Sequence, residues 1–274
     1  MKPWLKYTLM LVAIALIYGT ITGTYIMVVS FLKVFSGEIT GGESPLELAQ
    51  ILGNHLVISL ILAQVITTYL IYILVKKEGF ASSLYIKPLS VKHSILAVLL
   101  GIAALQLSTL IITGLSILFP NQVALYIENA EGLTSANIIL VVISIGLFAP
   151  IFEELFLRGL FFRYFDTLLS PKWLIFLSAL AFAIFHANFI QGAFAFTAGL
   201  VMAYAFYITK NILVPILIHL GHNLFSVFLS LDFAVDIQSR YPLMNTLILV
   251  LGILFIPILL LYFKQETKKI MISP

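Results

Sequence analysis

The stretch that decides the fold runs from Asn137 to Phe165 and reads NIILVVISIGLFAPIFEELFLRGLFFRYF. It is long enough to cross a membrane as a helix, since about 20 apolar residues span the hydrocarbon. Its apolar part nevertheless carries Glu153, Glu154 and Arg158. Ionisable residues inside a membrane cost about 2.5 to 3.5 kcal/mol each on insertion scales and are functional candidates by default. The stretch therefore predicts both a spanning helix and a buried polar site.

Composition extends this interpretation to the whole chain. The sequence is 61% hydrophobic and 10% charged, with a mean hydropathy of +1.11, whereas an ordinary soluble domain is about 25% charged. Long unbroken apolar runs favour helices over the alternating strands of a barrel. The chain has no cysteine, which excludes disulfides, thiolate nucleophiles and cysteine metal sites. A net charge of +3 gives no argument for nucleic acid. The predicted fold class is an all-α, polytopic integral membrane helical bundle.

Apolar length divides the chain into about eight spans. No internal repeat, linker or soluble segment separates them, so residues 1–274 are predicted to form one integral domain. The expected spans are Leu5–Phe35, Leu46–Val75, Ser94–Phe119, Asn137–Phe165, Trp173–Asn188, Gln191–Thr209, Ile212–Leu231 and Pro242–Phe263.

Loop charges set the orientation, because cytoplasmic loops carry an excess of lysine and arginine. If the N-terminus is cytoplasmic, only Lys33 and Arg240 fall outside. This bias predicts that both termini are cytoplasmic. The cations on the predicted inner side are Lys2, Lys6, Lys76, Lys77, Lys87, Lys92, Arg158, Arg163, Lys172, Lys210, Lys264, Lys268 and Lys269.

The fourth and fifth predicted spans form a helical hairpin that brings two titratable groups to one depth. Glu153 and His186 lie at similar distances along the chain from the turn between these spans. At 1.5 Å per residue, their depths should match to within about 3 Å. A carboxylate and an imidazole are therefore expected to meet across the hairpin.

Helical spacing assigns the other polar residues to faces. Glu154 and Arg158 are four residues apart, so the guanidinium is expected to neutralise Glu154 and leave Glu153 free. In the seventh predicted span, His219 and Asn223 share one face for the same reason, and His222 lies on a neighbouring face.

Three motifs built from these residues resemble those of the CPBP intramembrane proteases, a family named for CAAX prenyl proteases and bacteriocin-processing proteins and also called Abi proteins. Glu153 to Arg158, EELFLR, fits the EExxxR motif. Phe182 to His186, FAIFH, fits FxxxH, and His219 to Asn223, HLGHN, fits HxxxN. The motifs occur in family order on separate spans, so residues 137–231 are predicted to be the catalytic core.

The resemblance implies a glutamate-dependent intramembrane endopeptidase acting on a membrane-associated protein or peptide precursor. It implies that Glu153 and His186 activate a water and that His219 and Asn223 stabilise the oxyanion. From the residues themselves we expect a mechanism without a cofactor. Glu154 and Arg158 would support the site, with His222 as a possible additional residue. The expected partners are membrane lipid and the peptide or protein substrate. The lysine- and isoleucine-rich composition favours a bacterial plasma membrane.

Two alternatives stay open from the sequence. Glu153, His186 and His219 supply three ligands suited to zinc and leave a fourth position for water. Against zinc, the chain has no HExxH pair, and the amide of Asn223 is a poor ligand. The second alternative is a non-catalytic bacteriocin-immunity scaffold or transporter in which the same polar cluster binds an ion or a toxin.

Overall fold

The computed structural model describes residues 3–134 and 136–272, and all of their secondary structure is helical. The short helices are η1 (Lys76–Glu78), α3 (Phe80–Ser83), α5 (Pro120–Thr134) and α12 (Asp232–Arg240). A broken helix covers residues 138–165. The other helices are α1 (Pro3–Phe35), α2 (Pro45–Val75), α4 (Val91–Leu118), α9 (Pro171–Phe185), α10 (Phe189–Thr209), α11 (Leu213–Leu229) and α13 (Pro242–Ile272).

The predicted helical membrane bundle is confirmed, but the number of full-length spans is lower than eight. In the described part of the chain, six helices are long and apolar enough to cross a membrane, or seven if α11 and α12, bent by 80°, form one span. The fifth predicted span is α9, whose 15 residues cover about 22 Å of a hydrocarbon core of about 30 Å. It is short because the chain turns at His186 and Ala187, where Ala187 adopts a left-handed φ of 51°.

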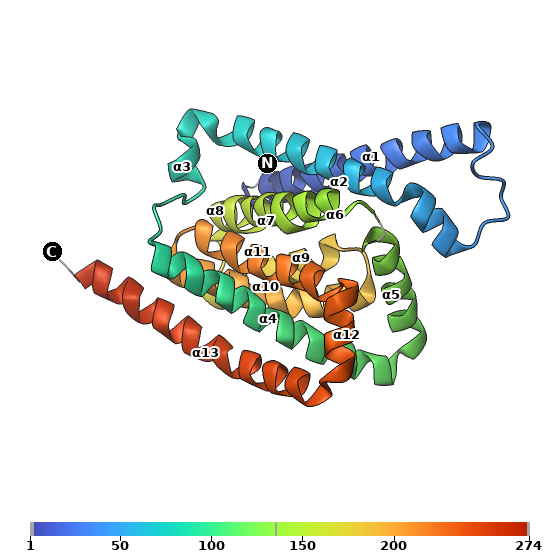
Figure 1. Ribbon diagram of the computed structural model, residues 1–274. Coiled ribbons are helices and arrows are strands. Elements are labelled where there is room, and N and C mark those ends of the chain that lie inside the picture. Colours follow the sequence, from blue (N-terminus) through green and yellow to red (C-terminus); the bar gives the residue numbers. More distant parts are fainter. Residues whose placement is uncertain (1–2, 135, 273–274) are drawn as a thin grey trace.

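Figure 1 shows how the long helices are arranged. α1 and α2 pair as a hairpin along one side of the molecule, and the broken helix lies between this hairpin and α11. α4, α10 and α11 pack together at the centre, with α13 along the outer side of α4. α5 and α12 lie at one end of the bundle, and α3 lies at the opposite end, towards the carboxyl terminus.

Glycines allow α4 and α11 to approach closely. A Cβ atom at Gly101 would overlap the carbonyl oxygen of Ile218, and one at Gly221 would overlap the carbonyl oxygen of Val98. Small residues of this kind let helix backbones meet in membranes, where apolar surface alone gives little drive for association. The crossing fixes the position of α11, the helix that carries His219.

The broken helix changes register twice around Glu153. It consists of α6 (Ile138–Val141), a π-helical segment η2 (Val142–Phe148), α7 (Ala149–Glu154), a second π-helical segment η3 (Leu155–Phe161) and α8 (Phe162–Phe165). The N–H of Ala149 donates to the carbonyl of Ser144. In the same register, the carbonyl of Ile145 would need the N–H of residue 150, which is a proline and has none. π-Helical turns are frequent at functional sites, and this one leaves the carbonyl of Ile145 free to accept from a side chain.

Candidate functional site

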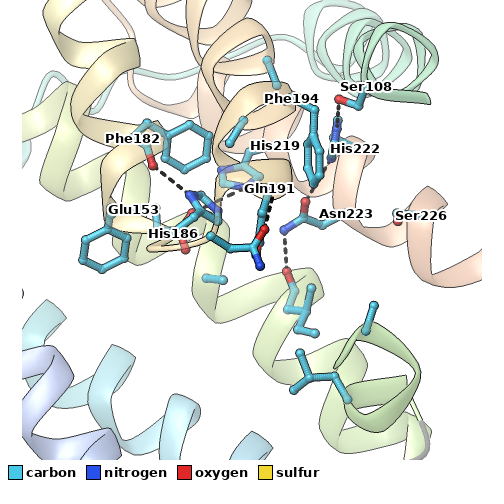
Figure 2. Close-up of a pocket in the computed structure, with 18 of the residues that line it drawn as sticks. Ser108, Glu153, Phe182, His186, Gln191, Phe194, His219, His222, Asn223 and Ser226 are labelled. Carbon is cyan, nitrogen blue, oxygen red and sulfur yellow. Dashed lines mark hydrogen bonds and ion pairs between the residues drawn. The ribbon is translucent and has the colours of Figure 1, made fainter. Parts of the chain in front are cut away.

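One cavity of about 520 Å³ contains the polar residues that the sequence singles out. Glu153, His186, His219, His222 and Asn223 all line it, from the broken helix, α9 and α11 (Figure 2). Its other walls come from α1, α2, α4, α5 and α10. The structure therefore brings the four predicted catalytic residues together, while their roles stay predictions.

Glu154 and Arg158 form a fully buried ion pair beside the cavity. The Nη1 of Arg158 donates to Oε1 of Glu154 over 2.9 Å, and both side chains are 0% exposed. The Nη2 of Arg158 donates to the carbonyl of Gly199 on α10, also over 2.9 Å. The guanidinium lies 5.1 Å from the ring centroid of Phe182 on α9. The pair expected from the i,i+4 spacing is thus confirmed, and it ties the broken helix to α9 and α10.

His219 lies between the two glutamates. Its Nδ1 is 3.0 Å from Oε1 of Glu154, the same oxygen that accepts from Arg158. An ionised carboxylate only accepts hydrogen bonds, so Nδ1 carries the proton. Nε2 of His219 faces Oε2 of Glu153 at 3.7 Å. Glu154 therefore orients the imidazole of His219, whose Nε2 faces Glu153.

His186 stands at the end of α9 with one ring nitrogen engaged. Its Nδ1 is 2.8 Å from the carbonyl of Phe182, which can only accept, so Nδ1 is the donor. In the neutral ring, Nε2 then keeps its lone pair for the cavity. Among the described residues, no hydrogen bond or ion pair links His186 to Glu153. The two side chains line one cavity, as the hairpin geometry predicts, without direct contact.

A chain of hydrogen bonds fixes Asn223. Its Nδ2 donates to the carbonyl of Ile145 over 2.9 Å, which satisfies the acceptor left free by Pro150. Its Oδ1 accepts from Nδ1 of His222 over 3.1 Å, and Nε2 of His222 lies 3.0 Å from Oγ of Ser108. With the proton on Nδ1, Nε2 accepts from the Ser108 hydroxyl. His222, on the neighbouring face of α11, therefore orients Asn223.

Several cavity residues lie outside the motifs and were not predicted. Ser108 comes from α4, Tyr18 from α1, Gln64 from α2 and Gln191 from α10. Gln64 and Ser108 are buried polar side chains in apolar helices, which is the signal that marks such residues in a membrane sequence. Tyr18 gives no such signal, because tyrosines are frequent in this chain.

The proposed zinc ligands do not form a metal site in this geometry. Within residues 3–134 and 136–272, no group of three or more His, Cys, Asp or Glu side chains is placed to hold a metal ion. Nδ1 of His219 and Nδ1 of His186 are both engaged by protein acceptors, which leaves Nε2 of each ring on the cavity side. The arrangement is that of carboxylates and imidazoles held by hydrogen bonds.

Fold and site together define a class: an integral membrane protein whose helices enclose a polar cavity lined by a carboxylate and imidazoles. Residues 135–225 match the family described as Type II CAAX prenyl endopeptidase Rce1-like. This is the CPBP/Abi family of intramembrane proteases, so the resemblance carried by the three motifs is confirmed over the matched residues. The match to this protease family implies intramembrane endopeptidase activity on a peptide or protein substrate. No curated protein and no solved structure matches the chain.

Proposed function

We propose that the chain hydrolyses a peptide bond with a water activated by Glu153 and His186. Of the described residues that line the cavity, Glu153 is the only carboxylate, and it is 8% exposed. This observation carries the proposal, since a general base must face the reacting water. The water loses a proton to Glu153 as its oxygen attacks the scissile carbonyl, and Nε2 of His186 accepts a hydrogen bond from the same water. The proton then passes to the leaving amine as the C–N bond breaks.

His219 and Asn223 are proposed to bind the oxyanion of the tetrahedral intermediate. One N–H of the Asn223 amide is used by Ile145, and the second is left for a ligand in the cavity. The ring of His219 already carries a proton on Nδ1. When Nε2 is protonated as well, its N–H donates to the oxyanion. The Glu154 carboxylate beside Nδ1 stabilises that charged ring. Removing one oxyanion donor typically lowers kcat by about 10² to 10³, so this loss is expected for Asn223→Ala.

The test compares two isosteric changes of glutamate to glutamine. Glu153→Gln keeps the shape of the side chain but cannot accept the proton of water. Glu128→Gln makes the same change at a residue of α5 that does not line the cavity. Both purified variants are assayed on a library of quenched fluorescent peptides with uncharged apolar residues. We expect wild-type rates for Glu128→Gln and a loss of at least about 10³ for Glu153→Gln.

A folded Glu153→Gln protein that cleaves within tenfold of wild type would refute the base assignment. A wild-type protein that cleaves no peptide of the library, yet confers protection against a bacteriocin, would favour the immunity scaffold instead.

A further inference from the structure

The two ends of the bundle differ in charge. The end that carries α3 has exposed cations on the loops and helix ends around it, and we call it the cationic end (Figure 1). The opposite end, with α5 and α12, is the acidic end. Its two cations are ion-paired, Lys33 with Glu38 at 2.5 Å and Arg240 with Asp236 at 2.9 Å. Exposed cations of the cationic end are Lys76, Lys77, Lys87, Lys92 and Lys172.

The segment from residue 79 to residue 90 closes the cationic end. Leu84 is 0% exposed and sits over Gly159, where an added Cβ would clash with its side chain. The carbonyl of Tyr85 accepts from the N–H of Ile212 over 3.0 Å, and the carbonyl of Lys87 accepts from Nδ2 of Asn211 over 3.1 Å.

A second group of contacts fixes the same segment from the broken helix and α10. Arg163 donates to the carbonyl of Ser83 over 3.2 Å and pairs with Glu78. The ring of Tyr85 packs edge-on against Phe206, which is 0% exposed. Together with the buried Glu154–Arg158 pair, these contacts separate the cavity from the cationic end.

The cavity instead reaches the acidic end. Its lining continues to Tyr126 and Asn129 on α5 and to Ser226 and Ser230 at the end of α11. Asn129, Ser226 and Ser230 are exposed. The first turn of α10 contributes Gln191, whereas the final residues of α10, towards the cationic end, do not line the cavity.

We infer that the substrate enters the site from the extracytoplasmic face of the membrane. Cations mark the cytoplasmic side of a membrane protein, the cationic end is closed, and the cavity opens at the other end. This inference rests on the proposed function and adds the substrate class: an extended segment of an exported or membrane-inserted polypeptide.

The lining of the cavity adds a chemical preference. No lysine, arginine or aspartate lines it among the described residues, and its walls combine aromatic rings with neutral amides. Pockets of this composition bind apolar groups and fix their orientation with a few polar contacts. The substrate segment next to the cleaved bond is therefore uncharged. The aromatic residues are Tyr18, Tyr126, Phe182, Phe185 and Phe194, and the amides on the open side are Asn129, Asn188 and Gln191.

Cysteine labelling tests the access route, because the natural chain has no cysteine to mask. Ser226→Cys places a thiol on the cavity wall, Asn121→Cys marks the exposed surface of α5, and Lys87→Cys marks the cationic end. Each variant reacts with a membrane-impermeant maleimide in intact cells and in inverted vesicles. In intact cells we expect Ser226→Cys and Asn121→Cys to label at least tenfold faster than Lys87→Cys, with Lys87→Cys reacting in inverted vesicles.

The inference is overturned if Ser226→Cys labels only from the side on which Lys87→Cys reacts, or from neither side. It is overturned equally if Lys87→Cys labels in intact cells. The readout needs no proteolysis, so the double variant Ser226→Cys/Glu153→Gln should label as Ser226→Cys does. A failure of the catalytic proposal appears only in the peptide assay and leaves this pattern unchanged.

Discussion

Arg158 makes three contacts that no other side chain can make at once. Its planar guanidinium reaches Glu154, the carbonyl of Gly199 and the face of Phe182 from one rotamer. A lysine presents a single ammonium and cannot donate in two fixed directions. Because the pair is 0% exposed, it holds three helices in register around His219.

We predict that Arg158→Ala destabilises the protein as well as lowering activity. The change leaves Glu154 as an unpaired buried carboxylate, and breaking a buried pair in this way costs about 3 to 5 kcal/mol. Arg158→Lys should recover only part of the loss. Thermal unfolding in detergent measures the effect, with Arg240→Ala, which removes an exposed i,i+4 pair with Asp236, as the control. Unchanged melting with lost cleavage would mean that Arg158 acts on the substrate directly.

Ser108 illustrates a residue that acts through another. Its hydroxyl reaches His222, which in turn orients the Oδ1 of Asn223. We predict that Ser108→Ala lowers kcat by about tenfold with little change in KM, because the lost hydrogen bond loosens a group needed mainly in the transition state. Ser108→Thr, which keeps the hydroxyl, should restore most of the rate. A change in KM alone would place Ser108 in substrate binding instead.

At the scale of helices, the α4–α11 crossing determines where the motif of α11 lies. A Cβ at Gly101 meets backbone atoms of Ile218 and His222, which cannot rotate away as a side chain would. The helix must shift and carry His219 with it. Gly114, on the same helix, has nothing within 4 Å of an added Cβ.

We therefore predict opposite results for two alanine substitutions on α4. Gly101→Ala should destabilise the bundle by about 1 to 3 kcal/mol through overpacking and reduce cleavage. Gly114→Ala should be neutral or slightly stabilising, since alanine favours a helix over glycine by about 1 kcal/mol. Melting temperature and cleavage rate are measured for both. Equal behaviour of the two variants would show that the crossing does not position the site.

At the scale of the whole molecule, the balance of positive and negative charge around the cavity can be compared with what a zinc site would require. Arg158 already supplies the buried positive charge that pairs with Glu154, next to the site. We predict that exhaustive chelation leaves peptide cleavage within about twofold of the untreated enzyme. Elemental analysis accompanies the assay. Stoichiometric zinc, with activity lost on stripping and restored by zinc alone, would overturn the metal-free mechanism.

The local features of the fold could be predicted from the sequence because lipid imposes strict rules on a chain. Each predicted span contains a helix, since backbone groups in hydrocarbon must bond within their own segment. The Glu154–Arg158 pair followed from helical spacing alone. Span length was less certain: α9 stops at Phe185 because the turn at Ala187 depends on the neighbouring α10, not on the apolar length of the segment.

The sequence alone therefore determined the membrane class, the helices, and the motif residues that meet in the cavity. Only the tertiary structure decided that Ser108 supports Asn223 and that Glu154, not Glu153, binds Nδ1 of His219. Such contacts join residues far apart in the chain, and helical periodicity says nothing about which helices become neighbours. The direction in which the cavity opens also depends on contacts between distant residues. The segment from residue 79 to residue 90 closes one end through contacts that exist only in the packed bundle.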